Sequence, residues 1–207
     1  MAKRGEINLI TGPMFSNKTT ELMLTLKRYL ISGKNVLMIK HSNDTRYSKN
    51  LASSHDGMCM IAVAVNSLQN VVVKEDVDII GIDEGQFFED LLKFCLKWIA
   101  IGKTIYIAAL CSKAKRFSDD LDIEWPEIQK IIPFVSDISF QKSVCIICGS
   151  SSATRNKCLV SLPKDGVLIG GGSKFVSVCV SCEDVEVLPQ HLENRGKCVE
   201  KIKELFI

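Results

Sequence analysis

The sequence lacks any long hydrophobic run, and no stretch approaches the roughly 20 apolar residues that a membrane-spanning helix needs. Its start, MAKRGEINLI, has neither the apolar segment nor the small-residue cleavage site of a signal peptide. An excess of charge is also missing, because 26 basic and 24 acidic side chains leave a net charge of only +2. So small a charge does not indicate a nucleic-acid or membrane surface. These absences predict a cytoplasmic protein with no nucleic-acid partner and no membrane partner.

The composition is that of a globular protein with many cysteines. Hydrophobic residues make up 46% and charged residues 24% of the 207 residues, which is enough chain for one domain with a buried core and a small appendage. Nine cysteines would indicate disulfides in a secreted chain. Without a signal peptide, free thiols or metal ligands are the better interpretation.

Short apolar runs alternate with helical patterns through the first part of the chain. Strands are expected over residues 7–11, 35–40, 58–65, 77–83 and 103–110. A helix is expected from Lys18 to near Gly33, and a second one over 87–102. Helices between nearly continuous apolar strands predict an α/β fold with a mostly parallel sheet covered on both faces. After Ile138 this alternation ends.

The segment TGPMFSNKTTE, residues 11–21, nearly matches the phosphate-binding loop G-x-x-x-x-G-K-[ST]. Gly12, Lys18 and Thr19 occupy their expected places, whereas Asn17 stands where the second glycine belongs. In such loops main-chain N–H groups face the phosphates, the lysine neutralises their charge and the hydroxyl binds Mg²⁺. After glycine, asparagine is the residue that best tolerates a positive φ. The setting between an apolar strand and a helix therefore predicts a real phosphate loop.

An acidic pair follows the apolar run 77–83, which ends on Asp83 and is followed by Glu84. In phosphate-loop folds an aspartate at the end of such a strand holds Mg²⁺ through water. The neighbouring glutamate can act as a general base that takes a proton from an attacking hydroxyl or water. Both a kinase and an ATPase fit this pair, and a solvated acidic turn is the alternative without a function.

Two cysteine pairs have the spacing of metal ligands, Cys145-x-x-Cys148 and Cys179-x-x-Cys182. Four such thiolates can close a tetrahedral structural Zn²⁺ site, which would fix the base of the long loop between the pairs. The glycines of LIGGGSKF (168–175) in this loop allow the main chain to approach a ligand closely. The other cysteines are expected to be buried small hydrophobic residues or inert surface thiols; they are Cys59, Cys95, Cys111, Cys158 and Cys198.

In their order along the chain these motifs resemble the thymidine kinases of vertebrate cytosol, many bacteria and poxviruses. The resemblance runs from about residue 5 to 182, through GPMFSNKTTEL, NDTRYS, GIDEGQFF, GKTIYIAAL, the two cysteine pairs and IGGGSKFVSVC. It implies a P-loop NTPase-like α/β domain and a small zinc-anchored lasso domain that covers the nucleoside. It also implies that a homotetramer phosphorylates the 5′-hydroxyl of thymidine with ATP and Mg²⁺, giving dTMP and ADP.

Three regions are expected on this basis. A nucleotide-binding α/β domain would occupy residues 1–141, and a zinc-binding lasso domain would occupy residues 142–183. A charged, helical tail would follow over residues 184–207.

The resemblance also assigns roles to single residues. Glu84 would be the catalytic base, Lys18 would neutralise phosphate charge, and Arg46 would lie near the transferred phosphoryl group. The metal ligands would be Thr19 and Asp83 for Mg²⁺, and Cys145, Cys148, Cys179 and Cys182 for Zn²⁺. ATP would contact Gly12, Pro13, Met14, Phe15, Ser16, Asn17, Lys18, Thr19, Asp44, Thr45, Arg46, Asp83, Glu84, Gly85 and Gln86. The nucleoside pocket would be formed by Met14, Gln86, Phe87, Leu110, Leu168, Ile169, Gly170 and Phe175. For Met14 and Phe87, plain core packing is the alternative.

Three departures from the family pattern concern phosphate geometry and base recognition. Asn17 replaces a glycine, Phe175 replaces the usual tyrosine, and CSKA (111–114) replaces DGTF. The last change removes an acid and an aromatic ring that flanks the base, and Phe117 is a candidate substitute for that ring. The alternative function is therefore a catalytically impaired homologue with a nucleotide-binding or regulatory role. A nucleic-acid-binding zinc-ribbon ATPase would need a basic aromatic face, which 7% aromatic residues do not support.

Overall fold

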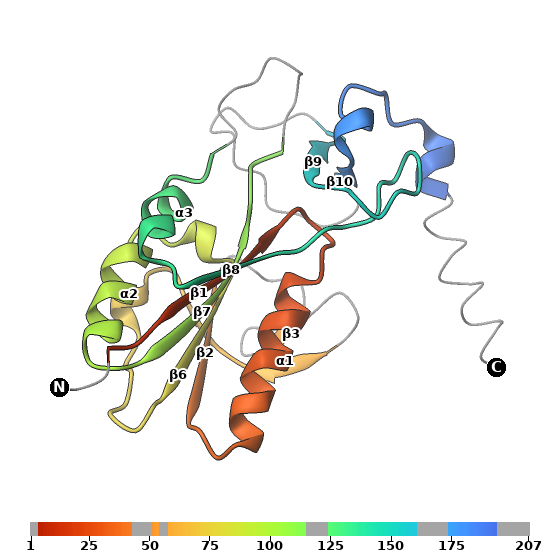
Figure 1. Ribbon diagram of the computed structural model, residues 1–207. Coiled ribbons are helices and arrows are strands. Elements are labelled where there is room, and N and C mark those ends of the chain that lie inside the picture. Colours follow the sequence, from red (N-terminus) through yellow and green to blue (C-terminus); the bar gives the residue numbers. More distant parts are fainter. Residues whose placement is uncertain (1–3, 43–50, 54–57, 115–123, 161–173, 194–207) are drawn as a thin grey trace, which may run out of the picture.

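The computed structural model describes residues 4–42, 51–53, 58–114, 124–160 and 174–193. A central sheet with helices on its two sides forms the larger part, and a smaller unit that carries the cysteine pairs lies beyond the end of the sheet (Figure 1). Within the described residues, no helix has both the length and the apolar character needed to cross a membrane.

The central sheet is parallel and has the strand order β5-β2-β6-β7-β1-β8. Its strands are β1 (Ile7–Gly12), β2 (Val36–His41), β5 (Val63–Val65), β6 (Ile79–Asp83), β7 (Thr104–Leu110) and β8 (Asp137–Phe140). Because all of the strands run in one direction, their carboxyl ends meet at one edge of the sheet. Ligands bind at this edge in open α/β folds.

The helices cover both faces of the sheet, as the sequence predicted (Figure 1). They are α1 (Lys18–Ile31), α2 (Leu91–Ala100) and α3 (Pro126–Ile131). Successive residues of a strand point to opposite faces. Thus Ile105 and Ile107 of β7 pack in the core under α2 and α3, whereas Ala108 packs in the core under α1 with Leu22 and Leu26. The described part of the chain also contains four short 3₁₀ turns, at Leu68–Asn70, Gly85–Phe87, Ile132–Phe134 and Val180–Cys182.

Two predicted elements have different bounds. The helix expected over 87–102 begins only at Leu91, because a separate 3₁₀ turn precedes it. The carboxylate of Asp90 accepts hydrogen bonds from the Ser67 hydroxyl at 2.6 Å and the Gln69 N–H at 2.8 Å, so it binds the turn Leu68–Asn70 and makes no cap bond to α2. The strand expected over 58–65 is two strands, since β4 (Cys59–Ile61) pairs with β3 (Leu51–Ser53) in a separate antiparallel sheet and only β5 joins the central one.

The unit that carries the cysteine pairs, here called the cysteine module, consists of the described residues of 143–160 and 174–187. It contains an antiparallel pair of strands, β9 (Arg155–Cys158) and β10 (Phe175–Val178). Its small core is formed by Cys145, Ala153, Val176, Val178, Cys179 and Cys182. Of the expected helical tail, residues 189–193 are helical, and residues 194–207 lie outside the described residues.

Candidate active site

The predicted phosphate loop connects β1 to the start of α1, at the carboxyl edge of the sheet. The first α-helical hydrogen bond runs from the Glu21 N–H to the Asn17 carbonyl at 2.9 Å. The preceding N–H groups of a helix have no partner in the helix itself and carry its positive dipole end. The end of the loop at the N-terminus of α1 is therefore a suitable binding place for phosphate oxygens.

The loop has an unusual backbone conformation that its residues can support. Asn17 has φ 59° and ψ 26°, a left-handed conformation that asparagine tolerates best after glycine, and its side chain makes no capping hydrogen bond. Phe15 is also left-handed, with φ 60°. At Gly12, where φ is 150°, an added Cβ would lie 2.2 Å from the Gln141 carbonyl oxygen. The glycine at this position is thus required by a close approach of two backbones.

Lys18 lies over the loop. Its Nζ donates to the carbonyl of Pro13 at 2.6 Å, and the hydroxyl of Ser16 donates to the same oxygen at 2.8 Å. The positive charge is thus held beside the N-terminus of α1, where phosphate charge would be neutralised.

The predicted Mg²⁺ residues lie in contact with each other. The hydroxyl of Thr19 donates to the Asp83 carboxylate, at 3.0 Å from Oδ1 and 3.3 Å from Oδ2. Asp83 is only 2% exposed at the end of β6. Lys40, which is 1% exposed, is its register partner on β2. Sequence reasoning missed Lys40, although a lysine that ends an apolar strand is a signal that could have found it.

Glu84 is held in place by Gln86. Glu84 adopts a left-handed conformation with φ 54° directly after β6. Gln86 Nε2 donates to Glu84 Oε2 at 2.6 Å, and Gln86 Oε1 accepts from the N–H of Leu110 at 3.1 Å. Gln86 is 5% exposed. Gln86 therefore connects the Glu84 carboxylate to the end of β7. Gln86 and Leu110, which were both predicted for the nucleoside pocket, are thus in contact.

An aromatic cluster lies beside the acidic pair. The ring of Phe87 lies edge-on to Trp125 at 5.5 Å between centroids and 5.7 Å from His41. Lys113, from the CSKA segment, places its Nζ 5.8 Å from the centre of the Trp125 ring. Trp125 was not predicted for the site. The proposed substitute ring, Phe117, lies outside the described residues.

The four paired cysteines converge as predicted. A tetrahedral Zn²⁺ with bonds of about 2.3 Å separates its sulfur ligands by roughly 3.8 Å. The four Sγ atoms lie within 4.8 Å of one another, and those of Cys148 and Cys179 are 3.7 Å apart. Burial opposes the ionisation of Cys145, but N–H groups of Cys148, Cys179 and Ile147 lower the pKa of its thiol to about 6. Burial and hydrogen bonds with the other thiols raise the pKa of Cys182 to about 12. The donor set fits Zn²⁺, which would stabilise all four thiolates together.

Of the remaining predicted residues, some lie in the described part of the chain and others lie outside it. Phe175 is buried in β10, opposite Cys158. Of the unpaired cysteines, Cys95 is buried in the core, which raises the pKa of its thiol, and Cys59 is exposed. The predicted residues that lie outside the described part of the chain are Asp44, Thr45, Arg46, Leu168, Ile169 and Gly170, together with Cys198.

Comparison with known proteins gives one consistent result. The family model described as thymidine kinase matches residues 5–183. The thymidine kinase of Sheeppox virus is 39% identical over 183 residues, covering 88% of this chain and 98% of the relative. The cytosolic thymidine kinase of Cricetulus griseus is 35% identical over 198 residues, covering 94% and 81%. Thymidine kinase 1 of Dictyostelium discoideum is 38% identical over 186 residues, covering 86% and 77%.

Proposed function

The chain belongs to the thymidine kinase family, and we propose that it transfers the γ-phosphoryl group of ATP to the 5′-hydroxyl of thymidine. The observation that carries the proposal is the hydrogen bond between Thr19 and Asp83. It brings the hydroxyl at the start of α1 together with the buried carboxylate at the end of β6, as a phosphate-loop enzyme requires for its metal ion. A second observation is that Glu84 lies next to this pair and is oriented by Gln86.

In the proposed reaction, Glu84 takes the proton of the 5′-hydroxyl as that oxygen attacks the γ-phosphorus. The bond to the β–γ bridging oxygen breaks, and ADP leaves with that electron pair. Lys18 neutralises charge on the phosphates, and Arg46 does so near the transferred group. Thr19 and Asp83 would hold Mg²⁺, which would neutralise negative charge on the phosphates during the transfer. Positioning and charge neutralisation account for most of the catalysis.

We propose that the nucleoside lies beside Phe87 and Leu110 and near Phe175, and that it also contacts residues 168–170, which lie outside the described residues. The aromatic contact between Phe87 and Trp125 supports this location, because the two edge-on rings place apolar surface beside the turn that follows Glu84. Met14 and Gln86 would complete the pocket. Gln86 would contribute by orienting the carboxylate of Glu84, to which its Nε2 donates a hydrogen bond.

Four further features remain proposals. The cysteine cluster would hold a structural Zn²⁺, and the chain would divide into the regions 1–141, 142–183 and 184–207. A homotetramer is supported by the edge strand β8, where Ile138 and Phe140 are 49% and 48% exposed. A cytoplasmic location is supported by relatives that are named cytosolic.

The function is tested by thymidine-dependent release of ADP from ATP. We expect release by the zinc-loaded wild-type protein, and none by a Lys18→Met variant, because methionine retains the length of the side chain without its charge. Release of ADP at the same rate without thymidine would favour an ATPase. No release under any condition would favour the impaired homologue.

Replacing Asn17 with glycine is expected to strengthen ATP binding about fivefold. A left-handed residue other than glycine stores backbone strain, and relief of about 1 kcal/mol corresponds to this factor. The Asn17 side chain makes no cap bond that the substitution would remove. Titration of ATP against both proteins checks the prediction. Weaker binding by the variant would mean that the Asn17 amide donates to a phosphate.

A further inference from the structure

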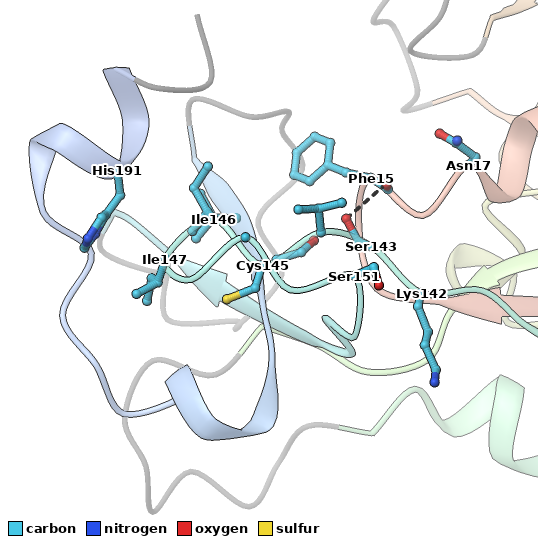
Figure 2. Close-up of a pocket in the computed structure, with 13 residues that line it drawn as sticks. Phe15, Asn17, Lys142, Ser143, Cys145, Ile146, Ile147, Ser151 and His191 are labelled. Carbon is cyan, nitrogen blue, oxygen red and sulfur yellow. Dashed lines mark hydrogen bonds between the residues drawn. The ribbon is translucent and has the colours of Figure 1, made fainter. Parts of the chain in front are cut away.

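The cysteine module binds the phosphate loop through the main chain of Met14. The N–H of Met14 donates to Asn156 Oδ1 at 2.7 Å, and its carbonyl accepts from the hydroxyl of Ser177 at 2.5 Å. The hydroxyl of Ser143 donates to the carbonyl of Phe15 at 3.1 Å (Figure 2). Three side chains of the module thus bind three polar groups of the loop backbone, the N–H and carbonyl of Met14 and the carbonyl of Phe15.

The strand pairing explains why Asn156 and Ser177 act together. They are directly opposite each other in the register of β9 and β10, so their side chains lie on one face of this small sheet. They are only 4% and 3% exposed. Ser177 precedes Cys179 by two residues, and its carbonyl accepts from the N–H of Ile146 at 3.0 Å. The same short strand therefore connects the cysteine cluster to the phosphate loop.

The Asn156 amide has only one orientation that satisfies its neighbours. Its Nδ2 donates to the carbonyl of Ser112 at 3.1 Å, while its Oδ1 accepts from Met14. A main-chain N–H can only donate and a carbonyl can only accept, so a flipped amide would lose both bonds. Asn156 therefore fixes the loop relative to the CSKA segment, in which this chain departs from its family.

The loop and the module also line a common pocket. The pocket has a volume of about 640 Å³, and its lining includes Phe15 and Asn17 of the loop, Ser143 of the module, and His191 beyond the module (Figure 2). The hydrogen bonds of Met14 and Phe15 to the module therefore orient the loop beside an open space.

We propose that Asn156, together with Ser177, is a positioning residue for ATP binding. The two side chains fix both ends of the Met14 residue and so hold Phe15 at φ 60°, a conformation that persists only where the surroundings impose it. The loop can then present its N–H groups to phosphate without rearrangement. This inference rests on the proposed role of the loop in ATP binding.

Steady-state kinetics of zinc-loaded Asn156→Ala and Ser177→Ala test the proposal. We expect the KM for ATP to rise on the order of tenfold in Asn156→Ala, which leaves two main-chain groups without their partner, and about threefold in Ser177→Ala. The KM for thymidine should rise less than the KM for ATP, because the side chains of Asn156 and Ser177 bind, in the described part of the proposed nucleoside pocket, only the main chain of Met14. If Asn156→Ala does not fold, the KM for ATP of Ser177→Ala tests the proposal, because this substitution removes only one hydroxyl.

Lys157→Met is the matched control. Lys157 follows Asn156 on β9, and its Nζ donates to the carbonyls of Glu183 and Val185 at 2.9 and 2.6 Å, within the module. This variant should lower the melting temperature and leave the KM for ATP unchanged. An unchanged KM for ATP in Asn156→Ala and Ser177→Ala would overturn the inference, and so would an equal rise in both substrates' KM values. A wild-type protein that does not bind ATP would overturn the proposed function itself, and the inference with it.

Discussion

Replacing Glu84 with glutamine is expected to lower kcat by roughly 10²–10⁴-fold while ATP affinity stays nearly unchanged. The amide cannot take the proton that the 5′-hydroxyl loses as it attacks. Gln86 Nε2 donates to Glu84 Oε2 at 2.6 Å, and the amide oxygen of the replacement can accept the same bond. The substitution therefore removes the base and retains the shape of the site.

Turnover and the equilibrium binding of a non-hydrolysable ATP analogue should be measured on the same preparation. Glu89→Gln is a suitable control, because Glu89 is an exposed glutamate close by in the sequence, and its substitution should change neither quantity. Near-normal turnover by Glu84→Gln would reassign the base to another group.

Replacing Cys145 with serine is expected to release the structural metal and unfold the cysteine module. The core of the module is small, and a structural Zn²⁺ site contributes about 10–16 kcal/mol of apparent binding free energy, which acts as folding free energy. Because Asn156 and Ser177 hold Met14 from this module, ATP binding should weaken as well. Metal analysis should find about one Zn²⁺ per wild-type chain and much less in the variant.

Cys158→Ser controls for the loss of a thiol as such. Cys158 lies in the same module, but its Sγ is hydrogen-bonded to the carbonyl of Val160 at 3.1 Å, and it does not belong to the four-cysteine cluster. This variant should keep its zinc and its melting temperature. Freshly prepared, unchelated wild-type protein without zinc would contradict the metal assignment.

The sequence was sufficient to predict the parts of the fold that depend on local pattern. Apolar runs identify β1, β6 and β7, since strands buried on both faces need such runs. The motif residues Thr19 and Asp83 were expected at one metal site, and their side chains are in contact. Asn17 is left-handed, whereas the sequence indicated only that asparagine tolerates such a conformation where a glycine is usual.

Other features depend on tertiary contacts that no local pattern reveals. β8 was missed because three of its four residues are exposed, so it carries no continuous apolar run. Trp125 reaches Phe87 only through the placement of α3 against the turn Gly85–Phe87. Asn156 is part of no motif, and its role arises from a contact with Met14 across 142 positions of sequence.

The central claim is that the γ-phosphoryl group of ATP is transferred to thymidine. Incubation of the zinc-loaded protein with γ-labelled ATP, Mg²⁺ and thymidine, deoxyuridine or deoxycytidine in parallel, followed by separation of the products, tests this claim directly. We expect label in the 5′-monophosphate of thymidine, and no transfer to 5′-deoxythymidine, which lacks the accepting hydroxyl. Label that remains in ATP, or that appears only as inorganic phosphate, would contradict it.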